Sequence, residues 1–276
     1  MAFSLEYNSL EIDNKDGIVI KSLDGLETLP IRTSLDDKVG SHGGSIWEQL
    51  YGMRTITLTG TVSGDDADGY FSNKASLRGA FRLGDIADLT IQVWDSEETT
   101  REIPAKVVSA LDIRESGGEP TFGRWQAQLL CPMPFFLDTT DTTATVGLVS
   151  GGFPVESPLE TPIPFEGDGV VVENTGEVPT NPIYTFSGDI VNPTLYNETT
   201  GTQFTVKTTI TGTDTVIVQL VNGVVDVKKG TENLVSGFRG EFVPLIVGNN
   251  TLRLFCSSYD DTPEAEVKFR NRYLGI

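Results

Sequence analysis

The chain has a single histidine, His42, and two cysteines, Cys131 and Cys256, among its 276 residues. A Ser-His-Asp or Cys-His catalytic group would have to be built around that one histidine, and a metal site with several histidine ligands cannot be assembled. His42 lies in a glycine-rich loop, Gly40–Ser45, where a histidine with no special role is the simpler interpretation. The cysteines are far apart and form no CxxC motif, so we expect two small buried thiols in a reducing compartment rather than a disulfide.

Positive charge is also scarce. The chain carries 20 Lys and Arg residues against 39 Asp and Glu residues, a formal net charge of −19. Neither half contains a basic stripe, so a grip on nucleic acid through phosphate contacts is not expected. Solubility is the simplest consequence of this charge, and an acidic surface along which DNA slides without sticking is the sharper alternative.

Long hydrophobic runs are missing. No stretch approaches the roughly 20 apolar residues that a membrane helix needs, and the N-terminus has neither a basic start nor an apolar run. We therefore expect no membrane insertion, no signal peptide and synthesis in a cytoplasm.

The sequence motifs that bind nucleotides are absent, and the one segment that resembles a metal-binding loop has the wrong spacing. Neither GxxxxGK[ST] nor GxGxxG occurs. Asp65–Gly69 resembles a calcium loop, but the EF-hand spacing then places Gly64 at the first ligand position and Ala75 at the twelfth. We interpret it as a solvated turn, and the acidic turn Tyr259–Asp261 likewise, with adventitious cation binding as the alternative there.

Carboxylate pairs and aromatics give no better site. Glu97 and Glu98 are adjacent in a polar turn, whereas a glycosidase needs two carboxylates that face one another. We expect core packing rather than sugar stacking for most members of the following aromatic set: Trp47, Trp94, Trp125, Tyr184, Tyr196 and Tyr259. The sequence therefore assigns no catalytic, cofactor-binding or metal residue, and it predicts a protein that is not an enzyme.

What the chain does have is 29 glycines and 14 prolines among many Thr and Val residues, a composition typical of short strands joined by tight turns. In the first half we predict a hairpin of residues 10–12 and 18–20 around Asp13–Gly17. Further strands are predicted at residues 54–62, 89–94, 103–113 and 122–130. Two prolines after Cys131 forbid a continued central strand, so residues 131–137 indicate an edge or a domain exit.

One helix is predicted, from Gly69 to Leu83. Its buried face combines three apolar side chains with the aliphatic stem of a lysine: Tyr70, Lys74, Leu77 and Phe81. Asp66 or Asp68 can cap its start, and Gly84 is predicted to end it.

Residues 139–164, rich in Thr, Gly and Pro, predict a connector whose apolar residues could add an edge strand to either neighbour. Beyond it, Asn174–Gly201 reads as strands separated by turns, because its Asn, Pro and Gly content excludes helix. Strands are predicted at residues 170–172, 183–187, 204–210, 216–221, 224–227, 242–247, 251–256 and 266–273. Asn222-Gly223 predicts a two-residue hairpin turn. We expect residues 266–273 to complete the second sandwich.

Assembled in order, these pieces resemble the distal tail protein (Dit) family of long-tailed, siphovirus-type bacteriophages. The first half contributes LEIDNKDGIVI, MRTITLTGTVSG, YFSNKASLRGAFRLG with LTIQVW, and RWQAQLLCPMPFFLD. The second half contributes NTGEVPTNPIYTFSGDIVNPTLYNETTG, the L-x-x-G-x-N-x-L pattern within Phe242–Leu252, and VKFRNRYLGI. Val247-Gly248 stands where family members usually carry Pro-Gly, and the threonine-rich connector is not typical of the family.

The resemblance implies a structural virion protein located at the distal end of a phage tail. In such a protein an N-terminal domain with one helix, residues 1–138, forms a homo-hexameric ring. A C-terminal galectin-like β-sandwich, residues 165–276, projects outward. The ring would join the tail tube protein to tail-tip, receptor-binding or baseplate proteins, and DNA would pass through it without specific binding or any cofactor. Edge pairing could close the ring, but the sequence does not identify the strand. The alternative is a carbohydrate-binding module of a tail or cell-surface protein.

Overall fold

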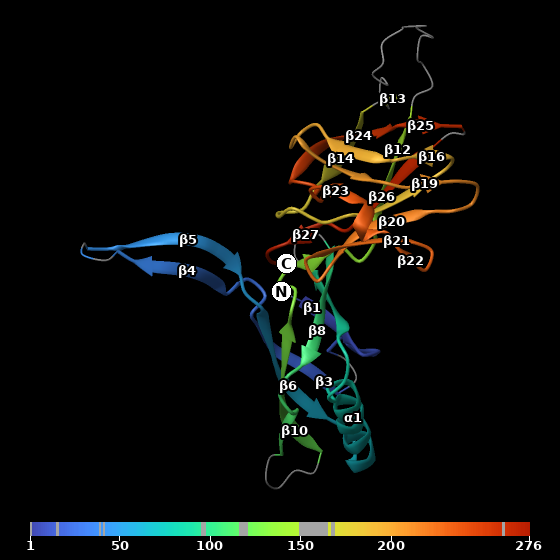
Figure 1. Cartoon of the computed structure of the whole chain (residues 1–276). Helices are drawn as coiled ribbons and strands as arrows, with labels where there is room; N and C mark the ends of the chain where they lie inside the picture. The colour runs from blue at the N-terminus through green and yellow to red at the C-terminus, as the bar shows by residue number, and fades with distance from the viewer. Residues whose placement is uncertain are drawn as a thin grey trace, which may run out of the picture. The chain divides into compact units, whose positions relative to one another are not determined.

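The computed structural model describes residues 2–14, 17–38, 40, 42–94, 98–115, 121–148, 165–166, 169–260 and 263–276. As predicted, the fold is mainly β with one α-helix in the described residues (Figure 1). The chain forms two compact units. The first comprises Met1–Thr139 together with Tyr273–Ile276, and the second comprises Thr140–Arg272.

The first unit is built on an antiparallel sheet in the order β2-β1-β7-β8-β10-β6-β3. The strands are β1 (Ala2–Tyr7), β2 (Leu10–Ile12), β3 (Ile18–Asp24), β6 (Arg54–Ser63), β7 (Ala87–Trp94), β8 (Glu98–Val107) and β10 (Phe122–Cys131). Short strands β9 (Asp112–Glu115) and β11 (Phe136–Leu137) pair with β10 and β8. The strand predicted at residues 103–113 is thus interrupted, because residues 108–111 leave the ladder between β8 and β9.

The hairpin predicted between residues 10–12 and 18–20 is wrong in its pairing, although both strands exist. β2 pairs with β1, and β3 pairs with β6. The hairpin turn is Asn8-Ser9, where both residues adopt positive φ, as a tight turn between twisted strands requires. Asn14 also has positive φ, and its side-chain oxygen accepts a hydrogen bond from the Ile20 amide at 2.8 Å.

Helix α1 (Ala67–Ala80) begins at Asp66, whose carboxylate accepts a hydrogen bond from the Gly69 amide at 2.8 Å, as one of the two predicted caps. The predicted face of the helix is confirmed as buried. The helix ends at Ala80 rather than at Gly84, because Phe81 leaves the helical path and stacks between two core rings, Tyr7 and Trp125.

Lys74 shows why a lysine is tolerated on that face. Its ammonium group donates a hydrogen bond to Glu115 and lies 5.6 Å from the centre of the Tyr70 ring, while its stem is buried. Hydrogen bonding and charge attraction from Lys74 lower the pKa of the Glu115 carboxyl.

Arg54, at the start of β6, is fully buried and bonds backbone carbonyls from three separate segments. It donates to Pro134 O at 2.9 Å, to Gly25 O at 3.1 Å, and also to Leu26 O and Leu274 O. The buried guanidinium thus fixes the last residues of the chain to the first unit. These bonds replace the solvation that burial removes.

The second unit is a sandwich of two antiparallel sheets. One has the order β12-β26-β15-β20-β21-β22, and the other has the order β13-β24-β17-β18-β23 with β14 also on β24. The strands of the first are β12 (Thr142–Gly147), β15 (Ile183–Ser187), β20 (Val216–Val221), β21 (Val224–Lys229), β22 (Glu232–Asn233) and β26 (Glu264–Phe269). Those of the second are β13 (Phe165–Glu166), β14 (Val170–Asn174), β17 (Thr194–Asn197), β18 (Thr202–Val206), β23 (Phe238–Gly240) and β24 (Gly248–Cys256). Strands β16 (Ile190–Val191), β19 (Thr209–Ile210) and β25 (Ser258–Tyr259) form a small third sheet, and η1 (Val235–Gly237) is a 3₁₀ turn. Inward side chains of the two large sheets meet in one core.

Several predicted elements of this unit change. Residues 242–247 form no strand, because Pro244 removes a donor, yet Val243 and Leu245 remain in the core. The strand predicted at residues 204–210 divides into β18 and β19. Part of the predicted connector is β12, which pairs with β26, while residues 149–164 lie outside the described residues.

The predicted strand at residues 266–273 also divides. β26 joins the second sandwich as expected, whereas β27 (Arg272–Tyr273) pairs with β11 and leads into the first unit. The Asn222-Gly223 turn is confirmed, with positive φ at both residues.

Candidate interaction surfaces

The residues that could carry chemistry are scattered or buried. Within the described ranges, no group of three or more His, Cys, Asp or Glu side chains gathers to hold a metal ion. Cys131 and Cys256 are buried free thiols, and burial raises the pKa of both, to about 12 for Cys131. Neither is therefore prepared as a nucleophile. None of the helical residues in the described ranges forms a helix long and apolar enough to cross a membrane.

The expectation for the aromatic set is confirmed for Trp125 and Tyr184, which are buried in the two cores. Tyr196 and Tyr259 are half-buried, and the side chain of Trp94 lies outside the description. Trp47 differs, because 73% of it is exposed. It belongs to an element that the sequence did not reveal.

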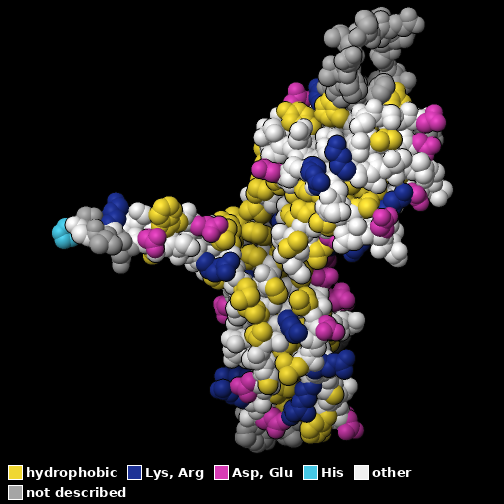
Figure 2. Space-filling view, viewed as in Figure 1, with side chains coloured by type: hydrophobic (Ala, Val, Ile, Leu, Met, Phe, Trp, Pro, Cys, Tyr) yellow, Lys and Arg dark blue, Asp and Glu magenta, His cyan; other side chains and the backbone are white. Residues whose placement is uncertain are grey.

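That element is a two-stranded hairpin of β4 (Ile31–Asp37) and β5 (Gly44–Tyr51), which form a sheet of their own. In Figure 1 the two strands run side by side with no other element of their unit along them, and Figure 2 marks their connection by His42, the one histidine. At the base, the Gly52 amide donates to Pro30 O at 2.6 Å and Tyr51 contacts Phe135 edge to face. Residues 44 and 45 of the predicted glycine-rich loop therefore lie within a strand.

A β-bulge decides which side chains share a face of the hairpin. Ser34 pairs with Glu48, but Leu35 pairs with Ile46, so Trp47 has no partner in the ladder. This shift places Ile46 on the same face as Leu35, since directly paired residues point to the same side. Four large side chains thereby form what we call the apolar face: Ile31, Leu35, Ile46 and Tyr51.

The apolar face is exposed, and the register places the pair Asp37–Gly44 on the same side next to the turn. Ile31, Leu35 and Ile46 are 62%, 65% and 64% exposed, and Thr33 and Gln49 lie between them on that face. An isolated two-stranded hairpin is at best marginally stable in water, and it gains stability when a hydrophobic face is covered. The apolar face therefore has the character of a contact surface.

The opposite face is mixed and carries Asp36 and Glu48 together with Leu50, which is 49% exposed. Both carboxylates belong to exposed residues, and neither makes an ion pair or hydrogen bond with another described residue. Arg32 on the same face brings the charge of these three side chains to −1.

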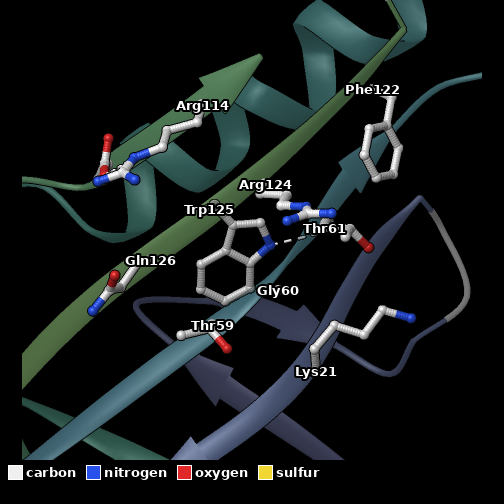
Figure 3. Close-up of a pocket in the computed structure, with 10 residues that line it drawn as sticks. Lys21, Thr59, Gly60, Thr61, Arg114, Phe122, Arg124, Trp125 and Gln126 are labelled. Atoms are coloured by element: carbon white, nitrogen blue, oxygen red, sulfur yellow. Dashed lines mark hydrogen bonds and ion pairs between the residues drawn. The ribbon is translucent and has the colours of Figure 1, made fainter. Parts of the chain in front are cut away.

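A second surface feature of the first unit is a groove of about 510 Å³ lined by residues of β3, β6, β9 and β10, which we call the cationic groove. Figure 3 shows Trp125 at its centre, with Lys21 and Arg114 on opposite sides. The Trp125 indole donates to Thr61 O at 3.2 Å and faces Gly60. A Cβ atom on Gly60 would lie 2.7 Å from the indole, so the close approach requires glycine.

Three cations surround this groove on a chain that is otherwise rich in carboxylates. Arg114 is paired with Asp112 at 2.8 Å. Lys21 and Arg124 are exposed, and neither has an ion-pair or hydrogen-bond partner among the described residues. The groove thus combines the half-buried Phe122 with two cations that have no ion-pair partner among the described residues.

In the second unit, buried asparagines hold the turns of the predicted motifs. Asn250, from the L-x-x-G-x-N-x-L pattern, accepts hydrogen bonds from the Ile246 amide at 3.0 Å and from the Asn197 side chain at 3.1 Å. Its amide group donates to Ile246 O, Gly248 O and Val172 O. Asn174, which opens the stretch singled out in the sequence, donates to Val178 O and Leu245 O. These polar residues therefore serve the scaffold rather than an exposed site.

These features define a two-part, mainly β protein in which the described residues gather no metal-binding cluster. Residues 175–273 match the model of the family described as siphovirus-type tail component, C-terminal domain, SPP1_Dit. The predicted resemblance to the Dit family is thereby confirmed for the C-terminal part of the chain.

Solved structures extend the likeness to the whole chain at the level of fold. The SPP1 Dit (gp 19.1) protein, described as a paradigm of the hub adsorption apparatus in phages infecting Gram-positive bacteria, is 15% identical. It has a TM-score of 0.69, with 99% of each chain covered. Chains from two structures of the phage p2 baseplate in its activated conformation, with Ca and with Sr, are each 9% identical with TM-scores of 0.50. They cover 100% and 99% of both chains, respectively. No curated protein matches the sequence. The chain has a Dit-like fold from end to end.

Proposed function

We propose that this chain is a distal tail hub, a structural component at the end of a siphovirus-type phage tail. One observation carries the proposal. A C-terminal segment that matches a tail-component family lies in a chain whose full length shares the fold of the SPP1 hub protein. The scarcity of histidine and the burial of both thiols fit a role that depends on shape and surfaces rather than on catalysis.

In this role six copies form a ring through their N-terminal domains, residues 1–138, and the C-terminal domains, residues 165–276, project outward after the connector at 139–164. One side of the ring binds the tail tube protein, and the other binds tail-tip, receptor-binding or baseplate proteins. The genome passes through the central hole without specific binding, and no cofactor is needed.

The negative charge of the chain favours the passage of DNA through the ring, but it also makes the subunits repel one another. Six copies at −19 carry −114 formal charges. Carboxylates near the hole would repel DNA phosphates and keep the genome moving. The same charges repel neighbouring copies, so uncharged or oppositely charged contacts must hold the ring together.

Electron microscopy and native mass measurement of the purified full chain test the proposal, at high protein concentration and with and without the tube protein. The expected result is a six-membered ring with outward lobes that caps the end of tail tubes. Monomers alone under every condition, with no binding to tube ends, would contradict it.

A further inference from the structure

We infer that residues 83–88 of one copy, which lead from α1 into β7 and which we call the exit segment, dock in the cationic groove of a second copy. The inference rests on the proposed ring and specifies one contact between its subunits. Both surfaces belong to the first unit, which is the part proposed to form the ring. A contact between two different surfaces of the same chain is the kind from which rings are built.

The groove needs an anion from outside. Arg124 lies directly opposite Arg114 in the β9–β10 ladder, and like charges in that relation repel one another. Arg114 is neutralised by its ion pair with Asp112, whereas Arg124 and Lys21 have no ion-pair partner among the described residues. Three cations and one carboxylate line the groove, a net charge of +2. A guanidinium group binds a carboxylate through strong, charge-assisted hydrogen bonds, so a carboxylate suits this place.

The groove also has room and apolar surface for an aliphatic side chain. Its volume of about 510 Å³ falls in the range of sites that enclose a small molecule. Phe122 is half-buried and stands two residues before Arg124 on β10, so the two side chains share a face of the strand (Figure 3). The ligand that fits this groove therefore combines a carboxylate with an aliphatic side chain.

The exit segment has that combination. Leu83 and Ile86 are 77% and 53% exposed, and Leu83 is the most exposed large hydrophobic among the described residues. Asp85 and Asp88 are exposed too, and neither has an ion-pair or hydrogen-bond partner among the residues that the structure describes. With Arg82 included, residues 82–88 carry a net charge of −1, opposite in sign to that of the groove.

Charge and number favour a second copy as the source of the segment. Two chains of net charge −19 repel one another over most of their surfaces, so neighbouring subunits need places where opposite charges meet. An assembly of identical chains presents one exit segment for every groove. The DNA backbone is the competing anion, but it offers phosphates without an aliphatic side chain.

A charge exchange in the full chain tests the contact through the dissociation constant of self-association. Arg124→Asp and Asp85→Arg should each raise this constant at least tenfold. A chain with both changes should return to within threefold of wild type, because the pair is restored with its charges exchanged. Asp85→Arg is the sharper variant: it changes the net charge from −19 to −17, which by overall repulsion alone would strengthen association.

Lys106→Asp is the matched control for Arg124→Asp. Lys106 is exposed on β8 and does not line the groove, and both substitutions change the net charge from −19 to −21. The control should have less than a threefold effect, and it should not restore association when combined with Asp85→Arg. Far-ultraviolet circular dichroism of each variant verifies that it is folded.

Cysteine cross-linking between two differently tagged chains locates the contact. One full-length chain carries Leu83→Cys and the other carries Gln126→Cys at the groove, so any disulfide between the two tags joins different copies. The native thiols are buried and should contribute little background. We expect at least fivefold more product from Leu83→Cys than from Ser76→Cys, which replaces it on an exposed position of α1.

The outcomes separate this inference from the proposed function. Rings that form while the charge exchange restores nothing, and while Leu83→Cys cross-links no more than Ser76→Cys, would overturn the contact and leave the hub role intact. Binding of short duplex DNA that Arg124→Asp abolishes and Asp85→Arg leaves unchanged would assign the groove to nucleic acid and also overturn the contact. A chain that never associates and never binds tube ends would overturn both the contact and the hub role.

Discussion

Replacing Asn250 should weaken the second unit far more than replacing its neighbour Asn249. Asn250 is fully buried, and its side chain bonds Ile246, Gly248, Val172 and Asn197. An alanine would leave several of these backbone groups without a partner in the interior. A buried group left unsatisfied costs about 1–3 kcal/mol, and partial rearrangement recovers some of it. We therefore expect Asn250→Ala to lower the free energy of unfolding of this unit by about 3–4 kcal/mol.

Guanidinium unfolding can resolve the effect because the three tryptophans, Trp47, Trp94 and Trp125, all lie in the first unit. Tryptophan fluorescence follows that unit, and far-ultraviolet circular dichroism follows both. With a denaturant slope of roughly 2–6 kcal/mol per molar, the second-unit midpoint should fall by about 1 M while the fluorescence midpoint stays in place.

Asn249→Ala is the matched control, since Asn249 is exposed and adjacent on β24. It should change the free energy of unfolding by less than about 0.5 kcal/mol. Equal midpoints for the two variants would refute the reasoning that the hydrogen bonds of Asn250 hold the turn.

Three further outcomes are expected. Cys131 and Cys256 should react with a thiol reagent at pH 8 only after denaturant is added, because burial raises both pKa values; prompt labelling of the native chain would contradict their burial. Glu115→Gln should remove a stabilising contact with Lys74. The folded pKa of Glu115 lies below its unfolded value, so the wild type should have the higher free energy of unfolding at neutral pH and should lose this difference as the pH falls below about 4.5. Urea titrations at pH 3 to 7 measure both free energies. A difference that stays constant over this range would contradict the ion pair with Lys74. Gly60→Ala should lower the free energy of unfolding by at least about 2 kcal/mol, because the new Cβ atom would lie 2.1 Å from a carbonyl oxygen of β3. An unchanged midpoint of thermal unfolding would show that β3 and β6 can move apart to admit it.

Local structure was predictable wherever neighbouring residues decide it. The alternation of residues 54–62 predicts a strand with one buried face, and in the structure Ile56, Leu58 and Val62 are buried. The spacing of Tyr70, Lys74 and Leu77 reports the helix and its inward face. Asn222-Gly223 specifies its turn by backbone conformation alone.

Pairing between distant strands was not predictable on the same basis. Residues 10–12 and 18–20 looked like hairpin partners because a turn-rich pentapeptide separates them. The first of these strands instead pairs with β1 across Asn8-Ser9, a weaker turn signal than Asn-Gly, and Asn14 accepts a hydrogen bond from the Ile20 amide. The groove is equally non-local, because Lys21, Arg114 and Arg124 come together only when three strands lie in one sheet.

The hairpin shows why a contact surface can escape a sequence pattern altogether. In simple alternation, Ile46 shares a face with Glu48 and Leu50, which reads as a mixed strand without a clear apolar side. The unpaired Trp47 shifts the ladder by one residue, so Ile46 joins Leu35 and Ile31 while Glu48 stays on the other face. A one-residue shift exchanges the faces of a strand. The bulge therefore brings Ile46 onto the apolar face, and deletion of Trp47 should keep it there, because Glu48 would then follow Ile46 directly and the pairs Ser34–Glu48 and Leu35–Ile46 would become consecutive rungs of a regular ladder.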